Sequence, residues 1–330
     1  MKLGSLQLKN NLILAPLQNV TTAPFRRFCR YFHEIGLVYV PMLYIKRIEQ
    51  NPKSVYQDLA KIEQERPIAV QIVGNDVLSL IKAIDMLESY KFDVLDFNAG
   101  CPSKRAIKGK YGGYLLKDID MLKKLLCKAV KHSSRPVSLK TRIGFDKRVN
   151  INDFKILLNE TGIEFATIHA RTVKQRFSDS NIDLDFLKQI KDISNIPIIG
   201  NGNIIDGKSA KDFLEKTNVD ALMIGRASMG NPGIFCEIYE FLSKGIINKP
   251  KKDKDLMEKY CKLYEFFIDE FLEGIEISYN KNDYKLMELK RNAIWFSKGL
   301  EHSTEIRIKL SKAKNLKQLK DILNEYFKEK

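Results

Sequence analysis

The stretch from Val94 to Lys104, with the sequence VLDFNAGCPSK, holds the most reactive candidate side chain. Its apolar start predicts a buried strand over 94–97, and the Asn-Ala-Gly that follows predicts a turn. Cys101 is therefore expected at the mouth of a strand, and basic residues follow it at Lys104, Arg105, Lys108 and Lys110. A thiol at the mouth of a strand, followed by cations and glycines, is an unusual combination, and the alternative interpretation is a small buried side chain beside a solvated loop.

Polar side chains of types that bind anionic or ring-shaped ligands recur between residues 15 and 230. They are Gln18, Gln71, Asn98, Lys140, Arg142, His169, Arg171, Asn201, Asn203 and Arg226. The glycine-rich segments 200–203 and 225–226 favour a phosphate site, because glycine lets backbone N–H groups approach an anion closely. Tight turns are the alternative for these segments. Lys140 places a fixed cation where negative charge on a cofactor ring would be stabilised. His169 is a contact to the same ligand or, alternatively, an interior histidine.

These side chains need a scaffold that brings distant segments together, and the hydrophobic pattern predicts one. Eight short apolar runs predict strands at 12–15, 38–40, 68–72, 94–97, 137–140, 166–169, 198–200 and 221–224. Amphipathic helices are predicted between them at 76–89, 118–131, 151–161, 184–193 and 208–216. This alternation implies an α/β fold with a parallel sheet, and eight units imply a (β/α)8 TIM barrel. The alternative, an open doubly wound sheet, calls for a G-x-G-x-x-G turn, which follows neither of the first two strands.

After residue 244 the pattern changes, and we expect a catalytic barrel domain at 1–244 and an all-helical domain at 245–330. A polar, proline-containing linker at 249–254 precedes predicted helices at 256–272, 284–296, 303–313 and 316–327. Segment 307–320 carries basic residues and no acidic one: Arg307, Lys309, Lys312, Lys314, Lys317 and Lys320. Arg291 and Lys298 add to this charge. The surface is either an ordinary solvated face or a contact for a polyanion.

The composition favours an anionic partner, because the formal net charge is +15, from 56 basic and 41 acidic residues. The five cysteines are scattered without a C-x-x-C pair, and the four histidines form no H-x-x-x-H pair, so neither a disulfide framework nor a metal site is expected. No apolar run is long enough for a transmembrane helix, and the N-terminus lacks a signal-peptide core. We expect a cytoplasmic protein with reduced thiols, and a monomer.

The ordered motifs of the first 235 residues resemble those of the flavin-dependent tRNA-dihydrouridine synthases. The matching motifs are LAPLQNVT at 14–21, VQI at 70–72, DFNAGCP at 96–102, LKTR at 139–142, IHART at 168–172, GNGN at 200–203 and IGR at 224–226. The tail segment 290–299, KRNAIWFSKG, resembles the helical-domain signature of the bacterial B-type branch. Two positions depart from the commoner family pattern, namely Gln18-Asn19 after the Ala-Pro and Phe97 before Asn98.

The resemblance implies an enzyme that reduces the C5–C6 double bond of particular uridines in tRNA with FMN, itself reduced by NADPH or NADH. Hydride from the flavin goes to C6, and Cys101 matches the residue that gives a proton to C5. The matches to the family's FMN contacts are Pro16, Leu17, Gln18, Gln71, Lys140, His169, Asn201, Gly202, Asn203, Gly225 and Arg226. The last five of these would hold the ribityl phosphate.

The resemblance also implies the substrate contacts. Asn98 would orient the uracil, and Arg171 would be a second contact. Lys104, Arg105 and the surface from Arg291 to Lys320 would hold tRNA phosphates while one base enters the barrel mouth. Two alternatives are an FMN enzyme acting on a free pyrimidine, as dihydroorotate dehydrogenases do, and an RNA-binding protein without catalysis. The basic tail argues against the first, and the intact Cys101 against the second.

Overall fold

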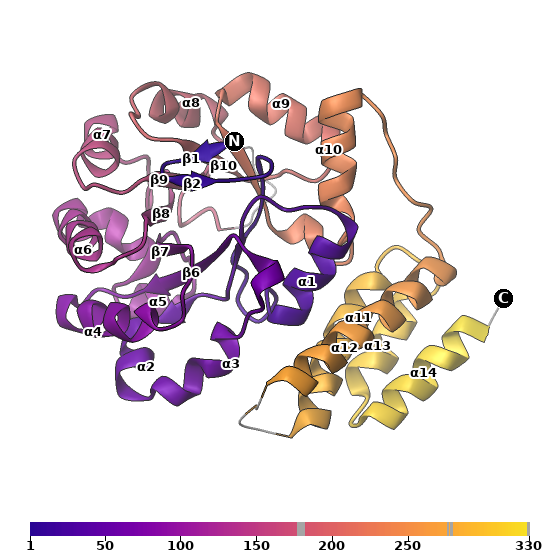
Figure 1. Ribbon diagram of the computed structural model, residues 1–330. Coiled ribbons are helices and arrows are strands. Elements are labelled where there is room, and N and C mark those ends of the chain that lie inside the picture. The colour runs from indigo at the N-terminus through magenta and orange to yellow at the C-terminus, as the bar shows by residue number, and fades with distance from the viewer. Residues whose placement is uncertain (177–181, 276, 278–279, 329–330) are drawn as a thin grey trace.

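A parallel sheet curls into a barrel in the computed structural model, and the C-terminal helices pack beside it (Figure 1). The structure describes residues 1–176, 182–275, 277 and 280–328. The barrel strands are β3 (Leu12–Leu14), β4 (Val38–Tyr39), β5 (Leu43–Tyr44), β6 (Ile68–Val73), β7 (Val94–Ala99), β8 (Val137–Arg142), β9 (Phe165–His169), β10 (Ile198–Asn201) and β11 (Ala221–Ile224). A short antiparallel hairpin of β1 (Lys2–Leu3) and β2 (Leu6–Gln7) precedes them.

Hydrogen bonds join the strands in the order β3-β11-β10-β9-β8-β7-β6-β4, and β5 pairs with the end of β6. The ring nearly closes between β4 and β3, where the Leu14 N–H donates to the Leu37 carbonyl at 3.0 Å. This topology confirms the predicted (β/α)8 barrel, and each of the eight predicted strands is present. β1, β2 and β5, each of two residues, were not predicted.

Helices follow the strands and cover the outside of the barrel (Figure 1). They are α1 (Ala23–Phe32), α2 (Ile45–Gln50), α3 (Tyr56–Leu59), α4 (Val77–Glu88), α5 (Lys104–Lys108), α6 (Ile119–His132), α7 (Ile151–Asn159), α8 (Leu184–Asp192), α9 (Gly207–Thr217) and α10 (Ile234–Lys244), with 3-10 turns η1 (Pro52–Val55), η2 (Glu63–Glu65), η3 (Gly112–Lys117) and η4 (Arg226–Ser228). The residues after Cys101, expected to be a loop, instead begin with α5. The reason is that the Ser103 hydroxyl accepts the Ala106 N–H at 3.1 Å and so caps a helical turn.

The barrel interior is built in layers, because side chains alternate between the two faces of each strand. The layer near the N-terminal ends of the strands is apolar and includes Val94 and Phe165, and Leu3 of the hairpin packs into it. The next residues to point inward are polar, as with the fully buried Asp96 and Ser138 on neighbouring strands. The barrel is therefore plugged by apolar side chains at one end and polar toward the other.

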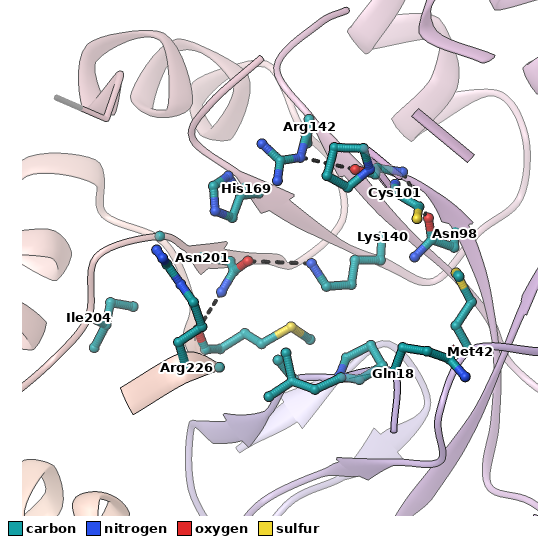
Figure 2. Close-up of a pocket in the computed structure, with 18 of the residues that line it drawn as sticks. Gln18, Met42, Asn98, Cys101, Lys140, Arg142, His169, Asn201, Ile204 and Arg226 are labelled. Carbon is teal, nitrogen blue, oxygen red and sulfur yellow. Dashed lines mark hydrogen bonds between the residues drawn. The ribbon is translucent and has the colours of Figure 1, made fainter. Parts of the chain in front are cut away.

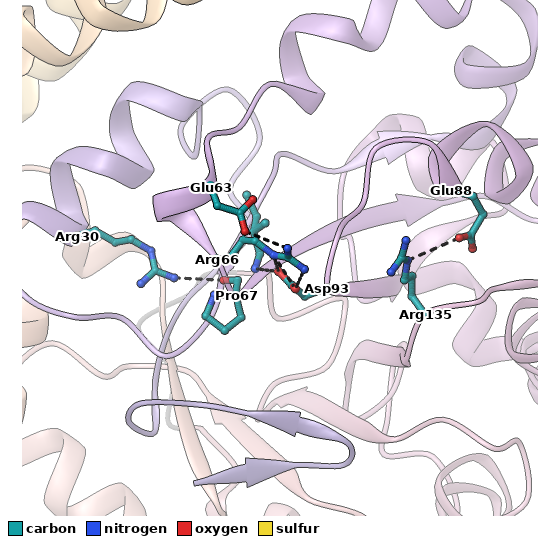
Figure 3. Close-up of polar contacts among 8 residues, drawn as sticks. Arg30, Glu63, Arg66, Pro67, Glu88, Asp93 and Arg135 are labelled. Atoms are coloured by element: carbon teal, nitrogen blue, oxygen red, sulfur yellow. Dashed lines mark hydrogen bonds and ion pairs between the residues drawn. The ribbon is translucent and has the colours of Figure 1, made fainter.

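An ion pair fixes the start of β6 and β7 (Figure 3). Arg66, just before β6, pairs with Asp93, just before β7, at 2.5 Å. The Asp93 carboxylate also accepts the Ile68 N–H at 2.8 Å. This register places Gln71 and Asp96 side by side on the two strands.

Four helices follow the linker at 245–253, namely α11 (Lys254–Gly274), α12 (Lys281–Phe296), α13 (Ser303–Lys312) and α14 (Leu316–Lys328). All four were predicted. Helices α11 and α12 pack on α1 through Phe28, whose ring centroid lies 5.9 Å from Tyr260, 5.1 Å from Tyr264 and 5.7 Å from Phe296. The α1–α11 contact thus buries an aromatic cluster between the barrel and the C-terminal helices.

A buried carboxylate, Glu288 on α12, also joins these helices to the barrel. It accepts hydrogen bonds from the Tyr264 hydroxyl at 2.5 Å and from the hydroxyl of Thr22, which precedes α1, at 3.1 Å. It further pairs with Arg291, one turn along the same helix. Arg291, expected to contact RNA, is therefore held against its own helix with a side chain only 20% exposed.

We predict that Glu288→Ala lowers the free energy of unfolding by about 2–4 kcal/mol, because it leaves Arg291 and Tyr264 without their buried acceptor. The matched control is Glu258→Ala on α11, whose carboxylate pairs with the exposed Lys262 and is worth about 0.5 kcal/mol. Urea unfolding of the two variants measures both losses. Equal losses of unfolding free energy in the two variants would show that Glu288 does not stabilise the contact between the C-terminal helices and the barrel.

Candidate active site

A cavity of about 920 Å³ opens at the C-terminal ends of the barrel strands, a size suited to a cofactor or another small molecule. Cys101 and Asn98 lie on one side of it, Arg226 and Ile204 on the other, and Lys140 and Asn201 between them (Figure 2). Every residue expected to bind the cofactor lines this cavity, together with Asn98 and Cys101. The structure thus brings together side chains from seven strand ends that are up to 210 residues apart in the chain.

Four of the expected substrate contacts lie outside the cavity lining. Lys104 and Arg105 are exposed on α5, where the Arg105 guanidinium lies 5.9 Å above the Tyr44 ring. Arg171 is fully buried, and its guanidinium donates to Asn203 Oδ1 at 3.0 Å. Arg291 lies on α12 beside Glu288.

The cavity also includes residues that were not among the expected cofactor contacts. They are Met42, Arg142, Ile204, Ile205, Met223, Met229 and Lys298, along with smaller neighbours. Arg142 stands at a predicted strand end, so its position was a usable signal. Lys298 follows α12 and reaches the cavity from the C-terminal helices, and no local pattern could have placed it there.

The loop that carries Cys101 is held tightly against the strand ends. The Asn98 side-chain oxygen accepts the N–H groups of Gly100 and Cys101 at 3.0 and 2.9 Å. The Arg142 guanidinium donates to the Gly100 carbonyl at 3.0 Å. A Cβ at Gly100 would lie 3.2 Å from the Thr141 carbonyl carbon, so glycine allows the loop to rest on β8. The half-buried thiol of Cys101 ends up 3.4 Å from the Ser103 hydroxyl.

Positive charge dominates this cavity. Lys140 is half-buried and donates to the Asn201 side-chain oxygen at 3.4 Å. Burial, together with the neighbouring Arg142 charge, lowers the pKa of Lys140, and Asp96 opposes this shift. Burial and the charge of Arg171 lower the pKa of Arg142 to about 10. Such a concentration of desolvated cations favours binding of an anion.

One carboxyl group, Asp96, lies beneath these cations. Burial raises its pKa, and hydrogen bonds from Gln71 and Ser138 and the charge of Lys140 act in the opposite direction. Among the described residues that line the cavity itself, none is an aspartate or a glutamate. The positive charge of the cavity lining is therefore available to an anionic ligand.

The residues present fit a ligand with a flat ring system and a phosphate. Pro16, Leu17 and Met229 contribute apolar surface to the cavity lining. His169 is buried, and its Nδ1 has no hydrogen-bond partner among the described residues, which leaves it available to a ligand. Gly202 has a φ of +132°, a backbone conformation that favours glycine and lets the chain turn closely around an anion.

No group of three or more His, Cys, Asp and Glu side chains that could hold a metal ion occurs among the described residues. None of the described helices combines the length and the apolar character needed to cross a bilayer.

TIM-barrel enzymes carry their active sites at the C-terminal ends of the strands, and this chain is a TIM-barrel enzyme. It belongs to the dihydrouridine synthase (Dus) family, whose model matches residues 13–330. The chain is 33% identical to tRNA-dihydrouridine synthase B of Pasteurella multocida (strain Pm70), over 93% of this chain and 90% of that protein. It is 32% identical to tRNA-dihydrouridine synthase B of Vibrio vulnificus (strain CMCP6), over 93% and 92%.

A protein of Rickettsia bellii (strain RML369-C), named a probable tRNA-dihydrouridine synthase, is 28% identical over 99% of this chain and 97% of its own length. The relatives of 31–34% identity carry the B-type name, which confirms the B-type branch expected from segment 290–299. Among solved structures, a mutant of morphinone reductase in complex with tetrahydroNAD matches with a TM-score of 0.48 and 14% identity, over 76% of this chain and 91% of that one.

We predict that His169 makes the flavin-free protein less stable at acidic pH. Burial and the charges of Arg142, Lys140, Arg171 and Arg226 hold the pKa of His169 well below its ordinary value. The unfolded chain takes up this proton below about pH 6.5 and the folded chain does not, so stability falls as the pH falls, by up to about 2 kcal/mol at pH 5. Urea unfolding at pH 7 and pH 5 measures this loss.

The control for this prediction is His169→Gln, which cannot titrate and should lose less stability than the parent over the same pH interval. An equal acid-induced loss in the parent and the variant would contradict a neutral, buried His169.

Proposed function

We propose that this chain is a tRNA-dihydrouridine synthase, which uses FMN and NADPH or NADH to reduce the C5–C6 double bond of specific uridines in tRNA. The observation that carries the proposal is the cationic cavity with Cys101 at its rim, lined by the residues expected to bind the cofactor. Family membership and relatives named tRNA-dihydrouridine synthase support it. We place the enzyme in the cytoplasm.

FMN would occupy the cavity and supply hydride chemistry. Pro16, Leu17 and Gln18 would flank the ring system, and Gln71 and His169 would bind it through hydrogen bonds. Lys140 would place its charge where the reduced ring is negative, which stabilises that state. The phosphate would lie at the far end of the cavity, against the segment 201–203 and the residues Gly225 and Arg226.

Cys101 would give a proton to C5 of the uracil. Its thiol lies at the rim, where a base that enters the cavity mouth can reach it, and it is half-buried, so bulk water has limited access. Asn98 lies next to it at the cavity wall and would orient the uracil. Arg171 would act by holding Asn203 rather than by direct contact, because it is fully buried.

Exposed lysines and arginines would hold the tRNA backbone. Lys104 and Arg105 on α5 lie directly after the Cys101 loop and face solvent. On the C-terminal helices, Lys312, Lys314 and Lys317 are exposed around the turn between α13 and α14. We propose that residues 1–244 form the catalytic domain and residues 245–330 a tRNA-binding domain, acting as a monomer. Such phosphate contacts weaken as salt concentration rises.

We predict that the purified protein with NADPH and unmodified tRNA forms dihydrouridine, and that Cys101→Ala keeps its FMN but forms the product about 100- to 10,000-fold more slowly. The reason is that a positioned general acid contributes a rate factor of about this size. Mass spectrometry of digested tRNA measures the product, and Cys236→Ala, on α10 and outside the cavity lining, is the matched control. A Cys101→Ala variant as fast as the parent would overturn the assignment of the acid, and an absence of dihydrouridine with the parent would overturn the function.

We predict that Arg226→Ala weakens FMN binding by about tenfold or more, because a charge-assisted contact to a phosphate is worth about 1.5–3 kcal/mol. Quenching of flavin fluorescence on titration of the flavin-free protein measures the dissociation constant. Lys216→Ala, which removes a cation on α9 that pairs with Asp212, should leave it unchanged. Equal affinity in the parent and in Arg226→Ala would place the phosphate elsewhere.

A further inference from the structure

Asp96 is a buried carboxylate to which the proposed reaction gives no role. It lies on β7 two residues before Asn98, and both side chains face the barrel interior. Its Oδ2 accepts a hydrogen bond from Gln71 Nε2 at 2.6 Å, and its Oδ1 accepts one from the Ser138 hydroxyl at 2.6 Å. The side chain is fully buried, so water does not compete for these bonds.

The carboxylate determines which way the neighbouring amides point. Because carboxylate oxygens accept hydrogen bonds, Gln71 turns its NH2 group toward Asp96 and its oxygen away. That oxygen accepts Asn98 Nδ2 at 3.0 Å. Because the Asn98 NH2 group faces Gln71, the Asn98 side-chain oxygen points toward the following loop, where it accepts the N–H groups of Gly100 and Cys101 at 3.0 and 2.9 Å. Every bond in this series runs in one direction, from the Cys101 backbone back to Asp96.

We propose that Asp96 is a positioning residue for Cys101, acting through the amide groups of Gln71 and Asn98. With Asp96 in place, each amide has one favourable orientation, and the loop that carries the thiol has a fixed acceptor. With a neutral amide at position 96, Gln71 and Asn98 can reverse, which would turn an NH2 group toward the Gly100 and Cys101 N–H groups. The consequence for catalysis rests on the proposed function, whereas the consequence for the loop does not.

The first test measures the loop in flavin-free protein by hydrogen–deuterium exchange. In Asp96→Asn, the peptide that contains Gly100 and Cys101 should exchange about tenfold faster than in the parent, because its N–H groups lose a defined acceptor. Ser138→Ala is the matched control, since it removes the other hydrogen bond to the same carboxylate and leaves the path to Cys101 intact. Its exchange in this peptide should equal that of the parent.

The second test separates the two half-reactions of the loaded enzyme. Reduction of the flavin by NADPH does not involve Cys101, so Asp96→Asn should slow this step, per bound flavin, less than it slows reoxidation, and only through Gln71 and Lys140. Reoxidation of the reduced flavin by tRNA needs the thiol in place and should slow by about 10- to 100-fold, the cost of a small misplacement of a catalytic group. Ser138→Ala should retain both rates within about threefold.

Parental exchange and parental reoxidation in Asp96→Asn would overturn the inference, as would equal slowing of both half-reactions, which would indicate a general loss of structure. If Asp96→Asn yields no soluble protein, Gln71→Met breaks the same path one link further along, and hydrogen–deuterium exchange of the flavin-free variant then has the same expected and contradicting outcomes. If tRNA does not reoxidise the reduced flavin of the parent enzyme, the proposed function is refuted. The exchange experiment then tests the role of Asp96 by itself.

Discussion

Desolvation of positive charge at the barrel mouth is the interaction on which the rest of the site depends. Lys140 and Arg142 are held where burial penalises their charged forms, and Asp96 is the carboxyl group that opposes this for Lys140. Moving cations out of water costs free energy unless an opposite charge is nearby. A bound anionic ligand would offset that cost, so this site favours an anionic ligand.

The barrel supplies the rigidity that such a site needs. Its strands start at a register fixed near Arg66 and Asp93, and its far end is plugged by apolar side chains. Polar side chains that point inward can then meet only toward the open end. The Cys101 loop is also held in place, because its backbone is hydrogen-bonded to the side chains of Asn98 and of Arg142 on the next strand. The Cys101 thiol is thus held by the strand ends and does not lie on a free loop.

The sequence was sufficient to predict eight of the barrel strands and most of the polar side chains that line the cavity. Short apolar runs marked each long strand, and in a closed parallel barrel the residues that end these strands, such as Gln71 and His169, must converge. Other features depend on contacts between distant segments. Lys298 reaches the cavity from the C-terminal helices, and Glu288 accepts a hydrogen bond from Thr22, which is far away in the sequence. Helix α5 begins at Ser103, which caps it, in a segment that was expected to be a charged loop.

The most direct test of the central claim is the nucleoside composition of cellular tRNA from a strain that lacks the gene and has no redundant paralogue. The account predicts that one or more dihydrouridines revert to uridine, and that the parent gene restores them whereas a Cys101→Ala copy does not. Mapping by mass spectrometry also identifies the positions. An unchanged dihydrouridine profile in the deletion strain would contradict the account.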